Sequence, residues 1–397
     1  MVLVNEGQPA RFLWARRTDD APSMPGFHVF PGGLVEAGDA SLPHDGGDDI
    51  GARVAALREL LEETGILIAH GAELLDESEI GELRDRFLED EEAAERFEAL
   101  GLRFRTAELE PIGRWVTPEF APARYDTRFF ALRVERPIEP SLDLREIDEA
   151  EWISVPDARA RWARGGVLIP PPIAVLLRDL GEDGRLDGEA LLGVYGAGGE
   201  PSQRWEVVPL IQLLPFLTPT LPPATHTNSY LIGGREALLV EPATPYGQEL
   251  ERMLSWIEEA RRAGIGPVAM FATHHHVDHV GAIEGLRRRL GLPLWAHALT
   301  AQRLEGSAFV DRLIEHDERI TLDGPTKVVL RAIHTPGHAP GHLCLLDEAS
   351  GALIAGDMVA SVGTIIVEPY DGDMALYLRS LREMIALEPS VILPAHG

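Results

Sequence analysis

The chain has 397 residues, of which 45% are hydrophobic and 25% are charged, and its formal net charge is -28. This length and composition predict a folded protein with two or three domains, and they exclude a largely disordered chain. The negative charge disfavours nucleic-acid binding, because affinity for a phosphate backbone depends on Lys and Arg. The basic run Arg287–Arg289 is therefore expected to be a solvated helix face.

The chain carries no pattern typical of secretion or of membrane insertion. Its first residues, MVLVNEGQPARFLW, lack a charged region followed by a long apolar core. No apolar run is long enough to cross a bilayer. The single cysteine, Cys344, excludes an internal disulfide and is expected to be buried. We therefore expect a soluble, cytoplasmic protein.

The N-terminal part begins with two strand-like runs, residues 1–4 and 11–17, on either side of a turn. The segment Pro31–Gly33 then breaks any regular element and lets the backbone approach another group closely. Farther along, the periodic apolar residues of 76–96 predict one amphipathic surface helix.

A helix predicted from Ile50 to the C-cap residue Gly65 carries three carboxylates on one face. Glu59, Glu62 and Glu63 have the spacing i, i+3 and i+4, so their like charges lie close together. A hard cation such as magnesium would relieve this repulsion. The alternative is an ordinary solvated helix face.

The segment RELLEETGI (58–66), preceded by Pro31–Gly33, resembles the box of the Nudix hydrolases. The resemblance covers residues 1–180 and implies an α/β/α sandwich with a mixed sheet. It also implies that the three glutamates hold magnesium or manganese against a diphosphate, and that Glu59 and Glu63 are catalytic. The supporting residues that it implies are Arg58, Gly32, Gly33 and Asp39.

Two features depart from the Nudix pattern. Asp39 stands where the family has a glutamate, and a longer insertion separates it from Arg58. The flanking segments SMPGFHVFPGG and GRWVTPEFAPARYDTRFF are similar to the coenzyme A diphosphatase-like branch. The resemblance thus implies a nucleoside diphosphate linked to another group, of coenzyme A type, as the substrate. A non-catalytic Nudix module is the alternative.

The composition changes after the Nudix-like part. A Gly-rich stretch that is polar at both ends predicts a linker over 182–204, between a first domain, 1–181, and a second domain, 205–397. Strands and helices alternate in the second part, which predicts a second α/β domain.

The second domain is arranged around FATHHHVDHVGAI, residues 271–283. The apolar run before this segment indicates a buried strand, and α/β sheets place their sites where strands end. His274 and His276 alternate toward one side, while Asp278 and His279 can reach a second point nearby. Imidazole nitrogen and carboxylate oxygen are ordinary ligands of zinc and other first-row metals.

Three further residues of ligand type follow strand-like runs, and they complete a resemblance to the metallo-β-lactamase superfamily over 210–397. That resemblance implies an αββα sandwich with two metal ions. The implied ligands are His274, His276 and His338 for the first ion and Asp278, His279 and His396 for the second, with Asp357 bridging them. His275 is expected to point away, and His334 and His342 are expected to have structural or outer-sphere roles.

The resemblance also implies hydrolysis through a metal-bound hydroxide, because two ions that share a water lower its pKa towards roughly 7. Asp278 would orient this nucleophile or take up its proton. Zinc is the expected metal, with iron or manganese as alternatives. The loop TPGHAPGH is similar to the glyoxalase II and lactamase-like endoribonuclease branches, and the acidity of the chain favours a thioester or ester as the substrate.

Other functions stay open at this point. One is an RNA-cleaving nuclease, which needs a basic track beside the metals. Another is a mononuclear iron persulfide oxygenase, which needs only His274, His276 and His338. A non-enzymatic scaffold is the last alternative. The expected partners are small-molecule substrates rather than nucleic acid or membrane, and the oligomeric state is left open.

Overall fold

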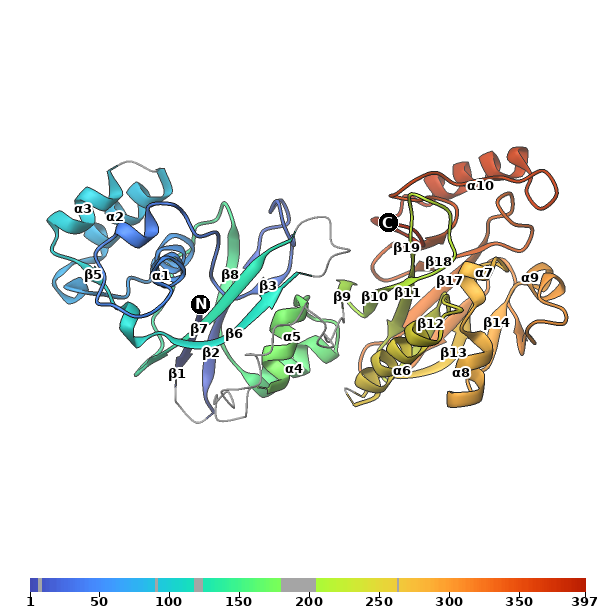
Figure 1. Ribbon diagram of the computed structural model, residues 1–397, viewed down its shortest axis with the longest axis horizontal. Helices are drawn as coiled ribbons and strands as arrows, with labels where there is room; N and C mark the ends of the chain where they lie inside the picture. Colours follow the sequence, from blue (N-terminus) through green and yellow to red (C-terminus); the bar gives the residue numbers. More distant parts are fainter. Residues whose placement is uncertain (6–8, 90–91, 118–123, 180–204, 263) are drawn as a thin grey trace. The chain divides into compact units, whose positions relative to one another are not determined.

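The structure of the chain is a computed structural model. It describes residues 1–5, 9–89, 92–117, 124–179, 205–262 and 264–397. These residues form two compact units, and strands alternate with helices in both (Figure 1). The predicted two-domain α/β fold is confirmed. The predicted linker, 182–204, lies outside the described residues, so the exact domain limits stay predictions.

The N-terminal unit is built on a six-stranded sheet with the order β3-β2-β1-β7-β6, in which β8 also pairs with β2. The sheet is mixed, because β1 runs antiparallel to β2 and parallel to β7. Its strands are β1 (Val2–Asn5), β2 (Arg11–Arg17), β3 (His28–Val29), β6 (Glu110–Val116), β7 (Asp126–Val134) and β8 (Ile147–Ser154). A separate two-stranded sheet pairs β4 (Ala69–His70) with β5 (Arg103–Phe104).

Helices cover both faces of the large sheet, because successive residues of a strand point to opposite sides. On β2, Phe12 and Trp14 pack with the core beside α4 (Val155–Ala163) and α5 (Pro171–Asp179), whereas Leu13 packs with α1 (Ile50–Thr64). The unit is therefore the predicted α/β/α sandwich. Helix α1 also ends as predicted, since Gly65 adopts φ 68° and donates its N–H to the carbonyl of Leu61.

One prediction for this unit is wrong. Residues 76–96 form two helices instead of one, α2 (Glu77–Glu89) and α3 (Ala93–Ala99). Glu92 precedes α3 at φ 51°, a left-handed conformation that does not continue an α-helix. The change of direction lets Leu83 of α2 and Phe97 of α3 both enter the core beside α1, where Phe97 stacks on Phe104 with ring centroids 4.4 Å apart.

The C-terminal unit contains a seven-stranded sheet with the order β15-β14-β13-β12-β11-β10-β9 and a five-stranded sheet with the order β16-β17-β18-β19-β20. The first sheet consists of β9 (Trp205–Val208), β10 (Ile211–Leu217), β11 (His226–Gly233), β12 (Glu236–Val240), β13 (Gly266–Phe271), β14 (Leu294–Ala296) and β15 (Arg312–Leu313). The second sheet consists of β16 (Arg319–Leu322), β17 (Val328–His334), β18 (Leu343–Asp347), β19 (Ala352–Gly356) and β20 (Val391–Pro394). The helices are α6 (Gly247–Arg262), α7 (Val277–Val280), α8 (Ile283–Leu290), α9 (Ala298–Arg303) and α10 (Met374–Ala386).

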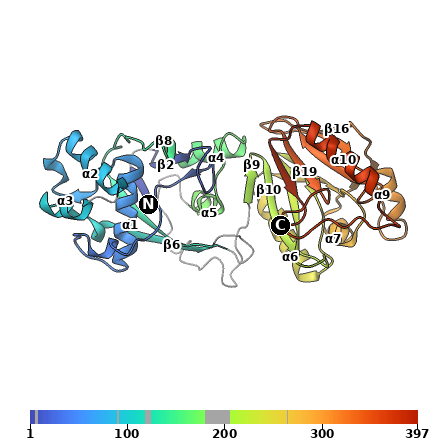
Figure 2. The same cartoon turned by 90° about the horizontal axis from the view of Figure 1, so that it is seen from above.

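The two sheets pack face to face, and helices cover their outer faces (Figure 1). Tyr230 of the first sheet shares the core between the sheets with Leu330 of the second, whereas the next residue, Leu231, packs against α6 and α8 on the outside. Cys344, which is buried as predicted, packs against α10 on the other outer face. The turned view in Figure 2 keeps α6 and α10 on opposite sides of the strands. The unit is the predicted αββα sandwich.

The segment after β13 contains the short helix α7, so Asp278 and His279 lie on a helical turn. Gly281 then packs against the loop after β12, where a Cβ atom would lie 2.5 Å from the nitrogen of Pro245. Among the described helices of both units, none has the length and apolar character needed to cross a lipid bilayer.

Candidate metal centres

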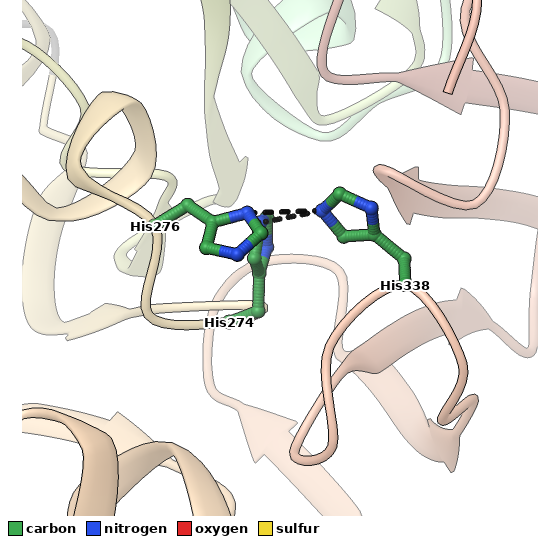
Figure 3. Close-up of side chains that lie close together, drawn as sticks. All are labelled: His274, His276 and His338. Atoms are coloured by element: carbon green, nitrogen blue, oxygen red, sulfur yellow. Dashed lines mark hydrogen bonds between the residues drawn. The ribbon is translucent and has the colours of Figure 1, made fainter. Parts of the chain in front are cut away.

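Three imidazoles meet at the carboxyl end of β13 (Figure 3). His274 and His276 lie on the loop after β13, and His338 reaches them from the loop after β17. His338 Nε2 lies 3.3 Å from His274 Nε2 and 3.0 Å from His276 Nδ1, and these two atoms lie 3.0 Å from each other. Tetrahedral zinc with bonds of about 2.05 Å to nitrogen would place its ligand atoms about 3.3 Å apart. The triad therefore has the right size for one divalent ion.

A second group lies beside the first and consists of Asp278, His279 and His396. Asp278 Oδ1 lies 3.8 Å from His279 Nε2, and its Oδ2 lies 3.6 Å from His396 Nε2. Asp357, which follows β19, lies between the groups, with Oδ1 3.3 Å from His396 Nε2 and Oδ2 3.5 Å from His338 Nε2. The structure thus brings all the predicted ligands into one cluster, although they come from four segments of the chain.

The buried atoms of this cluster fit divalent ions. His279 Nε2 and Asp357 Oδ1 are buried and make no hydrogen bond with any described residue, and such atoms are costly without a partner. Burial opposes a proton on His279, yet the carboxylates of Asp357, Glu241 and Asp278 raise its pKa well above the usual value. A divalent ion would supply both the missing ligand bonds and the counter-charge.

Two of the histidines are oriented by backbone carbonyls. His338 Nδ1 donates to the carbonyl of Ile366 at 2.9 Å, and His396 Nδ1 donates to the carbonyl of His226 at 3.0 Å. Because a carbonyl oxygen can only accept, each neutral ring carries its proton on Nδ1 and leaves the lone pair of Nε2 directed at the cluster.

Thr273 and Glu241, which sequence reasoning missed, orient His274. Thr273 Oγ1 donates to Glu241 Oε1 at 2.5 Å and lies 3.0 Å from His274 Nδ1, so the hydroxyl accepts the proton of that nitrogen. Glu241 Oε1 also lies 3.2 Å from His279 Nδ1. One buried carboxylate thus supports a histidine of each group. The only sequence signal was an acidic residue at the end of the apolar run ALLV.

Asp371, on the loop before α10, was also missed. His276 Nε2 donates to Asp371 Oδ2 at 3.0 Å, and His275 Nε2 lies 3.2 Å from the same oxygen. His275 Nε2 thus lies beside Asp371 and is not a member of the group formed by His274, His276 and His338. Arg303 Nη2 lies 3.0 Å from Asp371 Oδ1 and compensates its charge. Because Nε2 is bound to Asp371, Nδ1 is the nitrogen of His276 that faces His274 and His338.

Replacement of Asp371 is expected to weaken metal binding. Loss of a group that orients a metal-binding histidine typically costs 10–100-fold in affinity, so we expect a loss of about that size for Asp371→Ala and a smaller one for Asp371→Asn, which keeps an acceptor. Competition with a chelating dye measures both affinities, and Asp317→Ala, at an exposed position of the same unit, serves as the control. An affinity unchanged in Asp371→Ala would show that Asp371 does not position His276.

Two other histidines, one at the end of β17 and one on the loop after it, contact structural groups. His342 Nε2 accepts the backbone N–H of Asp357 at 3.1 Å and so fixes the residue between the two groups. Gly356 passes so close, at φ 50°, that a Cβ atom would lie 2.5 Å from His342 Nε2, and the position therefore requires glycine. The His334 ring stacks on His297, with ring centroids 4.2 Å apart.

In the N-terminal unit, α1 presents two of its predicted carboxylates to the glycine turn. Glu63 Oε2 accepts the N–H of Gly32 at 3.0 Å. A Cβ atom at Gly33 would lie 2.3 Å from Glu59 Oε1, so any larger residue there would displace the Glu59 carboxylate. The two predicted glycines therefore do what their position implies, which is to bring the backbone against the carboxylates.

Asp39 and Glu62 both bind Arg58. Arg58 Nε donates to Asp39 Oδ1 at 2.8 Å, while Nη1 lies 3.0 Å from both oxygens of Glu62 and 3.1 Å from Glu59 Oε1. Because Glu62 is turned to the guanidinium, the carboxylate oxygens of Glu59, Glu62 and Glu63 do not all lie within 4.8 Å of one another. Asp39, Glu59 and Glu62 are thus gathered around Arg58, whereas Glu63 faces Gly32.

The carboxylates of α1 are strongly perturbed. Burial, with the nearby Glu59 adding to it, raises the pKa of Glu63 to about 8, and burial raises the pKa of Glu62 to about 7. A carboxylate in such surroundings gains from a nearby cation that favours its charged form. A cation bound beside Glu62 or Glu63 would therefore lower these pKa values.

A surface hollow of about 460 Å³ lies beside β8 and α4. Burial lowers the pKa of His28, one of its lining residues, to about 4, so the ring is neutral at pH 7. Its Nδ1 atom makes no hydrogen bond with any residue that the structure describes. The remaining lining residues are Trp14, Leu142, Asp148, Glu149, Ala150, Glu151 and Arg161.

The basic run Arg287–Arg289 is engaged by neighbouring groups. Arg287 donates to Asp311 at 2.9 Å and to the carbonyl of Phe309 at 2.5 Å, and Arg289 donates to Glu251 at 2.9 Å. These contacts occupy donors that a phosphate backbone would need. The run is the solvated helix face that the sequence predicts.

Comparison with known proteins gives a family for each unit. The model of the metallo-beta-lactamase superfamily matches residues 222–396, and the model of the NUDT19 Nudix domain matches residues 43–180. The second match includes Arg58 and the three glutamates of α1, but it begins after the glycine turn and Asp39. The match to the first family spans every candidate ligand of the C-terminal cluster.

Individual relatives match one half of the chain at a time. The atrochrysone carboxyl ACP thioesterase AgnL7 of Paecilomyces divaricatus is 34% identical over 172 residues, which are 43% of this chain and 50% of that protein. The probable metallo-hydrolase YqgX of Bacillus subtilis is 28% identical over 190 residues, which are 43% of this chain and 85% of that protein. A solved Nudix hydrolase from Alicyclobacillus acidocaldarius is 29% identical, with a TM-score of 0.40, and covers 50% of this chain and 95% of its own. The chain thus spans only about half the length of relatives such as AgnL7.

Proposed function

Because the chain carries a metallo-β-lactamase superfamily domain in its C-terminal half and a Nudix domain in its N-terminal half, we propose that it is a thioester or ester hydrolase that uses two divalent metal ions. The broader statement, a probable metallo-hydrolase with a histidine-rich site, follows from the family match and the cluster. The proposal of two metal ions rests on one observation, which is that Asp357 directs one oxygen to each of two ligand groups.

The proposed ligands of the first ion are His274, His276 and His338, and those of the second are Asp278, His279 and His396, with Asp357 shared. When bound, two ions of this kind lower the pKa of a coordinated water and polarise the carbonyl under attack. We propose zinc for both, because imidazole and carboxylate in fourfold coordination suit it, with iron or manganese as the alternatives.

The residues of the chain hold the reacting groups and take up the proton. In the proposed reaction a water oxygen bonds to the acyl carbon, the C–S or C–O bond of the substrate breaks, and the thiol or alcohol leaves with a proton. Asp278 is the proposed group that accepts the proton of the water, because its carboxylate faces the cluster beside His396. His342 and Glu241 keep Asp357 and the histidines in place.

Two observations favour a thioester over RNA. AgnL7, the relative that is 34% identical over 172 residues, is described as a thioesterase. The chain has a net charge of -28, and its basic run on α8 is bound to neighbouring acceptors, so no row of free cations beside the cluster is available from that helix. A small-molecule thioester or ester is therefore the proposed partner of the C-terminal unit.

For the N-terminal unit we propose cleavage of a nucleoside diphosphate linked to another group, such as a coenzyme A-like compound. Glu59, Glu62 and Glu63 would hold magnesium or manganese, with Arg58 orienting them, and Glu59 and Glu63 would assist the attack of water on phosphorus. The burial and the raised pKa values of Glu62 and Glu63 support this role. A fused pair of activities could act on the two ends of one acylated nucleotide compound.

A substrate panel tests the proposal. The full chain, loaded with zinc, iron or manganese, is incubated with acyl thioesters, esters, coenzyme A derivatives, nucleotide sugars and single-stranded RNA, beside His276→Ala. We expect thioester or ester hydrolysis that is lost together with bound metal in His276→Ala. Turnover that persists in a metal-free His276→Ala sample would contradict the proposal, cleavage of RNA alone would favour the nuclease, and one iron per chain would favour the oxygenase.

A further inference from the structure

Five exposed, large apolar side chains belong to segments that contain or contact the candidate metal ligands, and they are called here the apolar rim. Their exposed fractions are 62% for Leu221, 57% for Val277, 41% for Val362, 44% for Ile366 and 78% for Tyr370. Single exposed apolar residues are ordinary on a protein surface. These five are different because each one adjoins or contains a group that contacts a candidate metal ligand.

The first side of the apolar rim lies beside His396. Thr220, the neighbour of Leu221, places its Oγ1 3.5 Å from His396 Nε2. Ser361, the neighbour of Val362, donates its backbone N–H to the carbonyl of His396 at 3.0 Å. The two segments also touch each other, since a Cβ atom at Gly363 would lie 3.2 Å from Cδ of Pro223. Leu221 and Val362 therefore lie on two segments that meet beside His396.

The second side continues around the histidine triad. The carbonyl of Ile366 accepts from His338, and Asp371, the neighbour of Tyr370, accepts from His276. Val277 stands between two candidate ligands in the chain, and its side chain is exposed while His279 is buried. The apolar rim therefore lies on three segments, distant in sequence, that contact ligands of both groups.

We infer that the apolar rim binds the hydrocarbon chain of the substrate, so that the preferred substrates are thioesters or esters of medium-length aliphatic acids rather than short or polar ones. This inference rests on the proposed function. A carbonyl held at the metal cluster has to extend its acyl chain over the surrounding loops, and those loops present apolar side chains. Each methylene that leaves water strengthens binding by about fourfold when it is fully buried. Because the rim is open, it covers the hydrocarbon chain only in part, so the gain in binding per methylene is smaller.

A homologous series of substrates tests the inference. The metal-loaded full chain is assayed with S-acyl-N-acetylcysteamine thioesters from acetyl to dodecanoyl. We expect kcat/KM to rise at least tenfold from acetyl to octanoyl, through a lower KM. In Leu221→Ser and Val362→Ser the ratio of octanoyl to acetyl kcat/KM should fall about threefold to tenfold. Ile385→Ser, at an equally apolar and 73% exposed position on α10, is the matched control and should keep the ratio.

The possible results separate this inference from the proposed function. Circular dichroism and metal content equal to those of the unaltered chain establish that each variant is folded and loaded. If the loaded chain cleaves no thioester or ester of any length, the proposed function fails. If it cleaves them with kcat/KM independent of chain length, or if the rim variants keep the ratio of the control, the proposed function stands and the inference is overturned.

Discussion

Asp357→Ala is expected to lower kcat for thioester or ester hydrolysis about a thousandfold. Asp357 is buried and directs one carboxylate oxygen to each ligand group, so its loss would remove the proposed shared ligand of the two ions. Stabilisation of the transition state by metal ions is worth several kcal/mol, and a loss of about 4 kcal/mol corresponds to about a thousandfold in rate. Steady-state kinetics with metal in excess measures the loss.

Elemental analysis of the same variant shows whether loss of bound metal causes the lower kcat. We expect Asp357→Ala to retain fewer ions per chain than the unaltered protein after dialysis, because neither group keeps its shared ligand. Asp323→Ala removes an exposed carboxylate whose ion pair with Arg235 is accessible to solvent, and it should leave both metal content and kcat unchanged. Full activity in Asp357→Ala with two bound ions would exclude a bridging role.

Glu63→Gln is expected to remove both the diphosphate activity and a pH dependence of stability in the N-terminal unit. Burial and Glu59 raise the pKa of Glu63 from the model-compound value of 4.5 to about 8. The folded state then binds this proton more tightly than the unfolded state, so without metal the free energy of unfolding falls as the pH rises from about 4.5 to about 8. The shift corresponds to roughly 3–5 kcal/mol.

Chemical denaturation in the presence of a chelator, followed by circular dichroism at pH 5 and pH 8.5, measures this difference. Glu63→Gln cannot ionise at position 63 and should show a much smaller fall, with the remainder due to Glu62, whose pKa is about 7. Magnesium should restore stability at pH 8.5 in the unaltered chain but not in Glu63→Gln. Glu77→Gln, on the exposed start of α2, is the control. If every diphosphate activity survives in Glu63→Gln, the N-terminal unit is not an active Nudix enzyme of the proposed kind.

Local sequence patterns located candidate ligands, and the resemblance to two known families supplied both folds and the division of the ligands between two ions. His274 to His279 follow one buried strand, and His338, Asp357 and His396 each follow another, and the ends of strands in α/β sandwiches meet at one edge. The same kind of signal located Glu59, Glu62 and Glu63 on one helix face. Such patterns depend on spacing within a short segment, which a single sequence displays directly.

The contacts that orient the ligands could not be predicted in this way. Asp371 meets His276, and Glu241 meets Thr273, only after segments far apart in the chain have folded together. Neither carboxylate stands at a spacing that marks it in the sequence. The break between α2 and α3 was missed for a related reason, because packing of Phe97 on Phe104 overrides a helical pattern that is locally continuous.

The candidate ligands come from both sheets of the sandwich, and this affects how long the folded protein survives. Four of them follow β13 in the first sheet, and three follow β17, β19 and β20 in the second. Ions held between them would tie the two layers of the sandwich together, and at a thousandfold excess over Kd each would add about 4 kcal/mol to the folded state. The metal concentration around the protein would then determine which fraction of the molecules stays folded and escapes degradation, as well as which fraction is active.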